Sequence, residues 1–248
     1  MLIIFILLGL IFGSFLNVLI YRLPRDLSVI YPRSFCTYCS STILWYCNIP
    51  LLSFIFLKGK SYCCNKKISI QYPIVEILSS LLWVWSYYYI DLISYQILFL
   101  IISSCLLVII FTDFIHFIVP IELNLTMFLS CFFIYLYNSE NILDSLYSMS
   151  LLGIYFLLLM LILGFFLRKE ALGYGDIILI AVVSFWLGWI DAFIIVFFSS
   201  FLSLIHWSVL TLNSNKKDIK LPFGSSIAFI SIFLYMIKET FQISTKLF

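Results

Sequence analysis

Long apolar stretches, separated by short polar or charged segments, dominate this chain. A helix that crosses the hydrocarbon core of a bilayer needs roughly 20 mostly apolar residues. Eight stretches meet or approach this length: residues 1–21, 71–90, 93–112, 120–137, 145–167, 174–188, 189–212 and 222–238. The sixth is short, and only a turn at Gly188 separates it from the seventh. We therefore predict an all-α, polytopic membrane protein with about eight transmembrane helices.

The composition excludes a water-soluble globule. Of the 248 residues, 64% are apolar and 10% are charged, whereas an average soluble domain is about half apolar and about a quarter charged. Too few polar side chains are available to cover a soluble protein of this size. No face is basic enough to follow a phosphate backbone. We expect the lipid bilayer as a partner, and no nucleic acid.

The distribution of basic residues predicts the orientation. With eight spans, the segments 22–70, 113–119, 168–173 and 213–221 lie on one side of the membrane, and they hold 12 of the 14 lysines and arginines. The positive-inside rule places that side in the cytoplasm. The first span is not expected to be a cleaved signal peptide, because no basic region precedes it and Arg22 and Arg25 follow it.

The largest polar segment, residues 22–70, is called the cysteine loop below. It contains Cys36, Cys39, Cys47, Cys63 and Cys64. Cys36 and Cys39 form a CxxC pair, which can bind one metal ion from a tight turn, and Cys63 with Cys64 would complete a tetrahedral zinc site. Adjacent cysteines rarely ligate one ion well, so Cys47 is an alternative fourth ligand. Free thiols are the other interpretation, since disulfides are not expected in the cytoplasm.

Three acidic residues lie at or inside predicted spans: Glu76, Asp113 and Asp176. A carboxylate at membrane depth is costly and indicates a functional site. The predicted topology places Asp113 and Asp176 at the same cytoplasmic depth, where they can share a proton and hydrolyse a peptide bond without a metal. Gly173 and Gly175 would let a substrate backbone approach Asp176 closely. The alternative is two interfacial aspartates that cap helices.

Several segments together resemble one family, the bacterial type IV prepilin peptidases. In chain order they are residues 13–24, the cysteine loop, 48–53, 68–69, 72–76, the spacing from Asp113 to Pro120, 173–176 and 222–224. The chain departs from the family pattern at three positions. Ser61 replaces the first cysteine of the second pair, Cys47 replaces an aspartate before Asn-Ile-Pro, and Ile121 replaces an aspartate after Pro120.

The resemblance implies an enzyme of the bacterial inner membrane. Asp113 and Asp176 match the catalytic pair of GxGD aspartyl proteases, which cut a basic leader from type IV prepilins and type II secretion pseudopilins at the cytoplasmic face. Many members also methylate the new amino terminus with S-adenosylmethionine. The resemblance assigns residues 1–90, with two spans and the cysteine loop, to methyl transfer and residues 91–248, with six spans, to proteolysis. Glu76 is the candidate for binding the amine or the sulfonium.

Other interpretations remain open at this stage. A carrier would use the same carboxylates as an ion path, although its binding site is expected near the midplane. A scaffold that has lost catalysis would be expected to lack one aspartate, and both are present. Asn17 and Arg22 either end the first span or form part of a binding surface. Gly224, with Pro222, either starts a helix or approaches the active site.

Overall fold

The computed structural model describes residues 1–167, 173–213 and 221–246. The described part is helical and contains two isolated β-bridges. It divides into two compact units, Met1–Gln96 and Ile97–Phe248. Two of the predicted cytoplasmic connections, around 168–172 and 214–220, lie outside the described residues.

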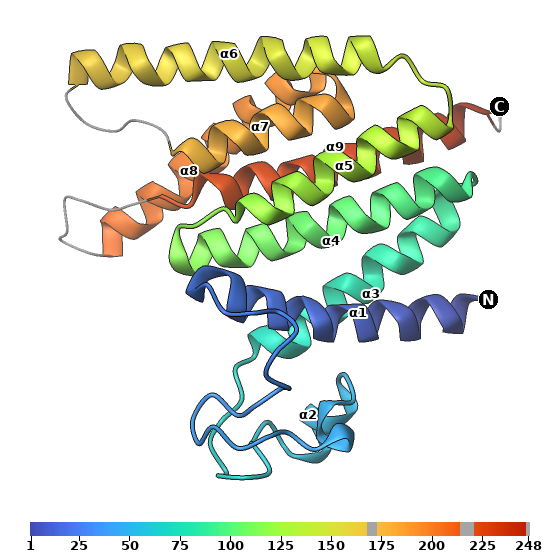
Figure 1. Cartoon of the computed structure of the whole chain (residues 1–248), viewed down its shortest axis with the longest axis vertical. Coiled ribbons are helices and arrows are strands. Elements are labelled where there is room, and N and C mark those ends of the chain that lie inside the picture. Colours follow the sequence, from blue (N-terminus) through green and yellow to red (C-terminus); the bar gives the residue numbers. More distant parts are fainter. Residues whose placement is uncertain (168–172, 214–220, 247–248) are drawn as a thin grey trace. The chain divides into compact units, whose positions relative to one another are not determined.

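The N-terminal unit consists of two long helices and the cysteine loop between them (Figure 1). The long helices are α1 (Leu2–Arg22) and α3 (Gln71–Tyr89). The loop contains three short helical turns, η1 (Leu23–Arg25), η2 (Trp45–Asn48) and α2 (Leu52–Phe56). These turns were not predicted, because they are too short to show a helical period in the sequence.

Small residues let α1 and α3 pack with their backbones in contact. A Cβ atom on Gly9 would lie 2.5 Å from the Cα of Ser80, and one on Gly13 would lie 2.6 Å from the Cα of Glu76. The hydroxyl of Ser80 donates to the carbonyl of Ile6 across the same interface at 3.2 Å. Membrane helices commonly associate through such small residues and hydrogen bonds, since lipid provides no hydrophobic driving force.

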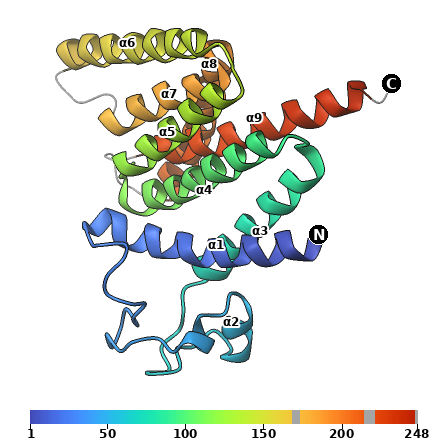
Figure 2. The same ribbon diagram turned by 45° about the vertical axis from the view of Figure 1, so that its right-hand side comes forward.

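The C-terminal unit contains most of α4 and five further helices. They are α4 (Ile93–His116), α5 (Ile121–Tyr137), α6 (Ile142–Leu167), α7 (Tyr174–Leu187), α8 (Trp189–Asn213) and α9 (Phe223–Lys246). Figures 1 and 2 both show α7 between α6 on one side and α5 on the other. Its residues from Leu179 to Trp186 are all buried. A helix that is apolar on every side is suited to this central place.

The eight long helices coincide with the eight predicted spans. Five of them are long and apolar enough to cross a membrane, namely α1, α4, α6, α8 and α9. The helices α5 and α7 are apolar but shorter, and α3 is rich in Trp and Tyr, which favour the membrane interface. The structure confirms an all-α membrane protein and is compatible with eight spans. It extends three predicted boundaries: α4 continues to His116, so Asp113 lies inside its last turn, α6 begins at Ile142, and α9 continues to Lys246.

We predict that Gly9→Ala and Gly13→Ala each destabilise the protein. The added methyl group would meet backbone atoms of α3, which cannot move aside independently of that helix. Such overpacking costs roughly 1–3 kcal/mol, measured as a lower melting temperature in detergent. The control is Gly153→Ala in α6, whose Cβ would meet Ala181 at an ordinary 3.5 Å. Equal stability of all three variants would contradict the α1–α3 packing.

Candidate functional site

Two aspartates from different helices meet beside the start of a third helix. Asp113 lies in the last turn of α4, and Asp176 lies in the first turn of α7. A Cβ atom on Gly224, near the start of α9, would lie 2.9 Å from Asp176 Oδ1 and 3.3 Å from Asp113 Cγ. Both carboxyl groups therefore lie beside the same point, and only the missing side chain of Gly224 leaves room for them.

The start of α9 supports the carboxyl group of Asp113, which is only 5% exposed. Its Oδ2 accepts a hydrogen bond from the backbone N–H of Ser225, with an N···O distance of 2.6 Å. Ser225 is the third residue of α9, where backbone N–H groups lack partners within the helix and the helix dipole is positive. The contact thus gives Asp113 a donor and a favourable field inside a buried site.

Asp176 is half-buried, and the two glycines before it differ in their surroundings. Gly173 is exposed, and a Cβ there would lie 3.3 Å from Asp176 Oδ2. A Cβ on Gly175 would lie 3.0 Å from the Cβ of Val119, in the connection between α4 and α5. Gly175 therefore has a packing role in the structure, whereas Gly173 keeps one side of the Asp176 carboxyl group open. The substrate-binding role of both glycines stays a prediction.

Val119 and Ser225 are neighbours of the aspartate pair that the sequence did not predict. Val119 Cγ2 would lie 2.7 Å from a Cβ on Gly224, so the α4–α5 connection and the start of α9 also approach each other closely here. The Pro-Phe-Gly segment that ends at Gly224 was the one sequence signal for Ser225, because an approach of this segment to the active site was one of its two interpretations. Nothing in the local sequence pointed to an apolar residue such as Val119.

Four cysteine sulfurs converge in the cysteine loop. The Sγ atoms of Cys36, Cys39, Cys63 and Cys64 all lie within 4.8 Å of one another, and Cys47 is not part of the group. The Cys36 and Cys64 sulfurs are 3.8 Å apart. Tetrahedral zinc with Zn–S bonds of about 2.3 Å places its sulfurs roughly 3.8 Å apart. The donor set therefore fits a structural zinc ion, and the alternative ligand Cys47 lies elsewhere.

Two similar turns form this cluster. In the first, Ser40 N donates to the carbonyl of Cys36, and Ser40 has a positive φ of 57°. In the second, Asn65 N donates to the carbonyl of Ser61, and Asn65 has a positive φ of 55°. Ser61 thus occupies the position that Cys36 has in the first turn. Ser61 has no thiol, and Cys63, the third residue of the second turn, supplies the fourth sulfur of the cluster instead.

Hydrogen bonds favour the thiolate at two of the four cysteines, Cys39 and Cys64, whereas the pKa of Cys63 is raised to about 11: its hydrogen bond with Ser41 lowers the pKa, but its contact with Cys39 and its burial raise it. Hydrogen bonds with Ser41 are the main cause that lowers the pKa of Cys39 to about 6, and one with Ser61 is the main cause that lowers the pKa of Cys64. The thiolate is the form of cysteine that binds metals. The serines of the two turns therefore favour the metal-binding form of Cys39 and Cys64.

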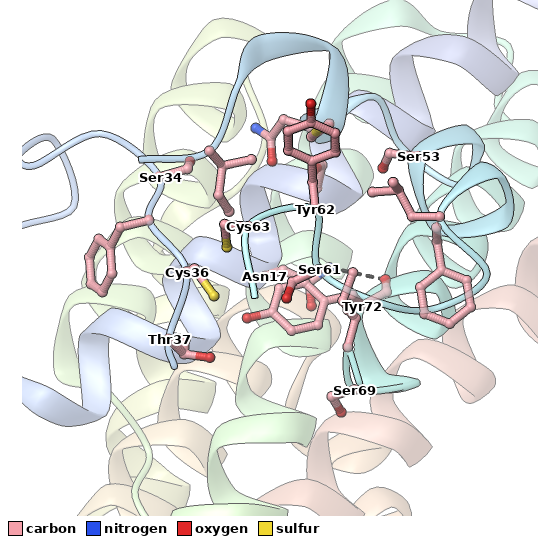
Figure 3. Close-up of a pocket in the computed structure, with 18 of the residues that line it drawn as sticks. Asn17, Ser34, Cys36, Thr37, Ser53, Ser61, Tyr62, Cys63, Ser69 and Tyr72 are labelled. Atoms are coloured by element: carbon pink, nitrogen blue, oxygen red, sulfur yellow. Dashed lines mark hydrogen bonds between the residues drawn. The ribbon is translucent and has the colours of Figure 1, made fainter. Parts of the chain in front are cut away.

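A second feature of the N-terminal unit is a cavity of about 600 Å³ between the cysteine loop and the helices. Figure 3 shows lining residues from the loop, among them Tyr62, and from the helices, among them Asn17 and Tyr72. Glu76 of α3 also lines it, and Glu76 Oε2 accepts a 2.8 Å hydrogen bond from the backbone N–H of Leu51. The structure therefore places Glu76 away from bulk water, beside a cavity large enough for a small molecule.

Arg22 organises the beginning of the cysteine loop. It is only 4% exposed, so its side chain lies inside the protein at the end of α1. Its guanidinium donates to the carbonyls of Ser28, Val29, Pro32 and Arg33. Arginine presents several donors in a fixed plane, so one side chain holds the loop backbone in a defined path next to the cavity.

Comparisons with known proteins agree for both units. A family model described as "Bacterial Peptidase A24 N-terminal domain" matches residues 7–90, and one described as "Type IV leader peptidase family" matches residues 100–208. The "Prepilin leader peptidase/N-methyltransferase" of Bacillus subtilis (strain 168) is 34% identical over 95% of this chain and 94% of its own length. The protein of the same name from Legionella pneumophila is 32% identical over 86% and 83%, respectively. No solved structure is significantly similar to the chain.

We predict that the purified protein contains about one zinc ion per chain, because four thiols that converge within 4.8 Å can provide the four ligands of a tetrahedral site. Cys39→Ser and Cys63→Ser should each strongly reduce the zinc content, measured by mass spectrometry of the metal. Acidification should release the ion, since protonated thiols do not bind it.

The matched control for the zinc prediction is Cys47→Ser, which lies in the same loop outside the cluster. It should keep its zinc. A wild-type protein purified without chelator that contains little zinc, or a Cys63→Ser variant with a full equivalent, would exclude this ligand set.

Proposed function

The chain belongs to the type IV leader peptidase family, and on this premise we propose that it removes the basic leader peptide from type IV prepilins and type II secretion pseudopilins and then N-methylates the new amino terminus. The relatives from Bacillus subtilis and Legionella pneumophila carry both activities in their names. The observation that carries the proteolytic part is the meeting of Asp113 and Asp176 at Gly224.

The aspartate pair provides the groups that peptide hydrolysis without a metal requires. One carboxylate takes a proton from a water molecule, which attacks the scissile carbonyl, while the other carboxyl group donates a proton to the carbonyl oxygen. The hydrogen bond from the N–H of Ser225 suits the negatively charged member of the pair. Asp113 is therefore our candidate for the base, and Asp176 is our candidate for the proton donor.

The open side of the Asp176 carboxyl group indicates where the substrate backbone lies. Gly173 is exposed beside Oδ2 of Asp176, so an extended peptide can approach this oxygen without meeting a side chain at position 173. Gly175 contributes indirectly, because it lets Val119 pack against the start of α7. We infer that the scissile bond lies on the Gly173 side of the pair.

The distribution of charge supports a defined location. In the eight-span topology, 12 of the 14 lysines and arginines lie on the side that carries the cysteine loop. We place this side in the cytoplasm, in the inner membrane of a bacterium. Asp113 and Asp176 lie at the ends of α4 and α7 that face the same side in this topology. A basic leader peptide held in the cytoplasm would then reach the aspartates from water.

The two activities divide between the two units in this proposal. The matched N-terminal domain, residues 7–90, coincides with the unit that holds the cysteine loop, and the matched peptidase segment, 100–208, lies in the unit that holds both aspartates. We assign residues 1–90 to methyl transfer, with S-adenosylmethionine as donor, and residues 91–248 to proteolysis. Zinc would hold the loop in shape through Cys36, Cys39, Cys63 and Cys64, because the loop has little apolar core.

We predict that Asp113→Asn and Asp176→Asn, each alone, lower leader cleavage by about 100-fold or more, since each carboxyl group has its own proton to transfer. Mass spectrometry of the N-terminus of a prepilin incubated with purified protein measures this. The control is Glu239→Gln in α9, which removes a carboxylate away from the pair and should cleave normally. Near-normal cleavage by either folded Asp variant would exclude the aspartate mechanism.

We further predict that Gly224→Ala slows cleavage by about tenfold to 100-fold, because a Cβ atom there must displace at least one of the two carboxyl groups. The loss should appear in kcat more than in KM, as expected when the reacting groups are misplaced. Gly153→Ala, which adds the same methyl group in α6 without a close contact, should cleave at the wild-type rate. An unchanged kcat in Gly224→Ala would show that this approach is not needed.

A further inference from the structure

An apolar segment, residues 49–57, interrupts the polar cysteine loop. Apart from Pro50 and Ser53, all its residues are Leu, Ile or Phe. The structure forms α2 within this segment and leaves three of its large side chains more than half exposed, namely Leu52, Ile55 and Phe56. Adjacent exposed apolar side chains of this kind mark a surface that meets a membrane or another molecule.

The helix α2 lies beside the pair of helices α1 and α3, and not beyond their ends. The N–H of Leu51, just before α2, donates to Glu76 Oε2 at 2.8 Å. Glu76 lies against Gly13, where a Cβ atom would be 2.6 Å from the Glu76 Cα. Gly13 precedes the last residue of α1, Arg22, by about 13 Å along the helix axis. Figures 1 and 2 likewise show α2 level with the middle of α1. Because α1 has the length and composition of a membrane span, α2 lies at the depth of the bilayer surface layer.

The backbone of the apolar segment is suited to an apolar environment. Several of its N–H groups, and one just after it, donate to carbonyls of the same segment, namely those of Ser53, Ile55, Leu57 and Gly59. The carboxyl group of Glu76 accepts the N–H of Leu51. Backbone enters lipid only where its polar groups have such partners. These hydrogen bonds therefore allow the segment to leave water.

Four exposed lysines, called the lysine group below, follow the apolar segment: Lys58, Lys60, Lys66 and Lys67. A β-bridge places Lys60 opposite Lys67, where like charges repel each other. No salt bridge involves the lysine group among the residues that the structure describes, and Asp26 is the only acidic residue in 22–70. The loop itself therefore does not neutralise this positive charge, which attracts anions.

Exposed apolar side chains next to a group of lysines match the surface of an anionic bilayer. Acyl chains cover the apolar side chains, and negatively charged head groups attract the lysines. The leader peptide of the proposed substrate is basic, so the lysine group would repel it. Charge therefore favours lipid over the substrate as the occupant of this surface.

We propose that α2 and the lysine group form a docking surface for anionic phospholipids of the bilayer that α1 crosses. The side chains of Leu52, Ile55 and Phe56 enter the boundary of the acyl chains, and the lysine group binds the head groups. This contact holds the cysteine loop against the membrane, with the hydrogen bond from Leu51 to Glu76 as its connection to α3. The inference rests on neither activity of the proposed function.

The depth of α2 is tested by replacing Phe56 with the photoreactive residue p-benzoylphenylalanine in the full-length protein. The protein is placed in nanodiscs of equal parts phosphatidylcholine and phosphatidylglycerol, illuminated and analysed by mass spectrometry, and Phe56→p-benzoylphenylalanine should form adducts with acyl chains. The matched control is the same replacement of Tyr31, which is 78% exposed against 80% for Phe56. Tyr31 lies between carbonyls that Arg22 binds at the end of α1, so it should form about fivefold fewer lipid adducts. Equal adduct yields at the two positions would overturn the docking surface.

The head groups of the adducts test the lysine group. Phosphatidylglycerol should exceed phosphatidylcholine among the adducts of position 56 by about threefold, because lysines near the surface attract anionic lipids. Lys58→Gln combined with Lys60→Gln should bring this ratio close to one. Arg33→Gln removes an exposed charge of the loop outside the lysine group and should leave the ratio unchanged. A ratio near one with all four lysines present would overturn anionic lipid as the partner.

An excess of prepilin separates lipid from substrate as the occupant. The adducts at position 56 should remain lipid adducts when prepilin is added. Their replacement by adducts with prepilin would assign the surface to the substrate and overturn the inference, while the aspartate mechanism would stand. A protein that forms the lipid adducts but does not cleave prepilin would contradict the proposed function alone.

Discussion

The catalytic proposal depends on one close approach, that of the start of α9 to two carboxyl groups. Asp113 is on α4 and Asp176 is on α7, and a Cβ atom on Gly224 of α9 would meet both carboxyl groups. At Gly224 there is no side chain, so the backbone of α9 comes within contact distance of both. The same turn donates the N–H of Ser225 to Asp113. The first turn of α9 therefore both leaves space for the two carboxyl groups and donates a hydrogen bond to one of them.

The surrounding bundle makes this approach stable. The central helix α7 is buried along most of its length, so Asp176 is fixed by a helix that cannot easily shift. Val119, in the short connection between α4 and α5, packs where Gly175 and Gly224 lack side chains. Small residues thus bring three chain segments together around two acids. In a bilayer this matters because close packing, and not the hydrophobic effect, holds helices together.

In the N-terminal unit, polar contacts order a loop that has little apolar core. Arg22 binds four backbone carbonyls at the loop's beginning, and Glu76 accepts the N–H of Leu51 near its middle. The four clustered cysteines connect its two turns. These contacts leave a cavity between loop and helices instead of a filled core. The loop is therefore an ordered part of the N-terminal unit that encloses a cavity, and it does more than connect α1 to α3.

The sequence by itself determined the class of protein, the eight helical segments and the two candidate aspartates, because the length of apolar runs and the cost of charge in lipid act locally along the chain. It left open whether Cys47 or Cys63 completes the metal cluster, and whether Gly224 belongs to the site. Only the tertiary structure decided these points. Which sulfurs converge depends on two turns 24 to 28 residues apart, and the role of Gly224 depends on helices that meet across more than a hundred residues of chain. A local sequence pattern cannot predict which of these distant residues come into contact, because the contacts arise from the packing of the folded chain.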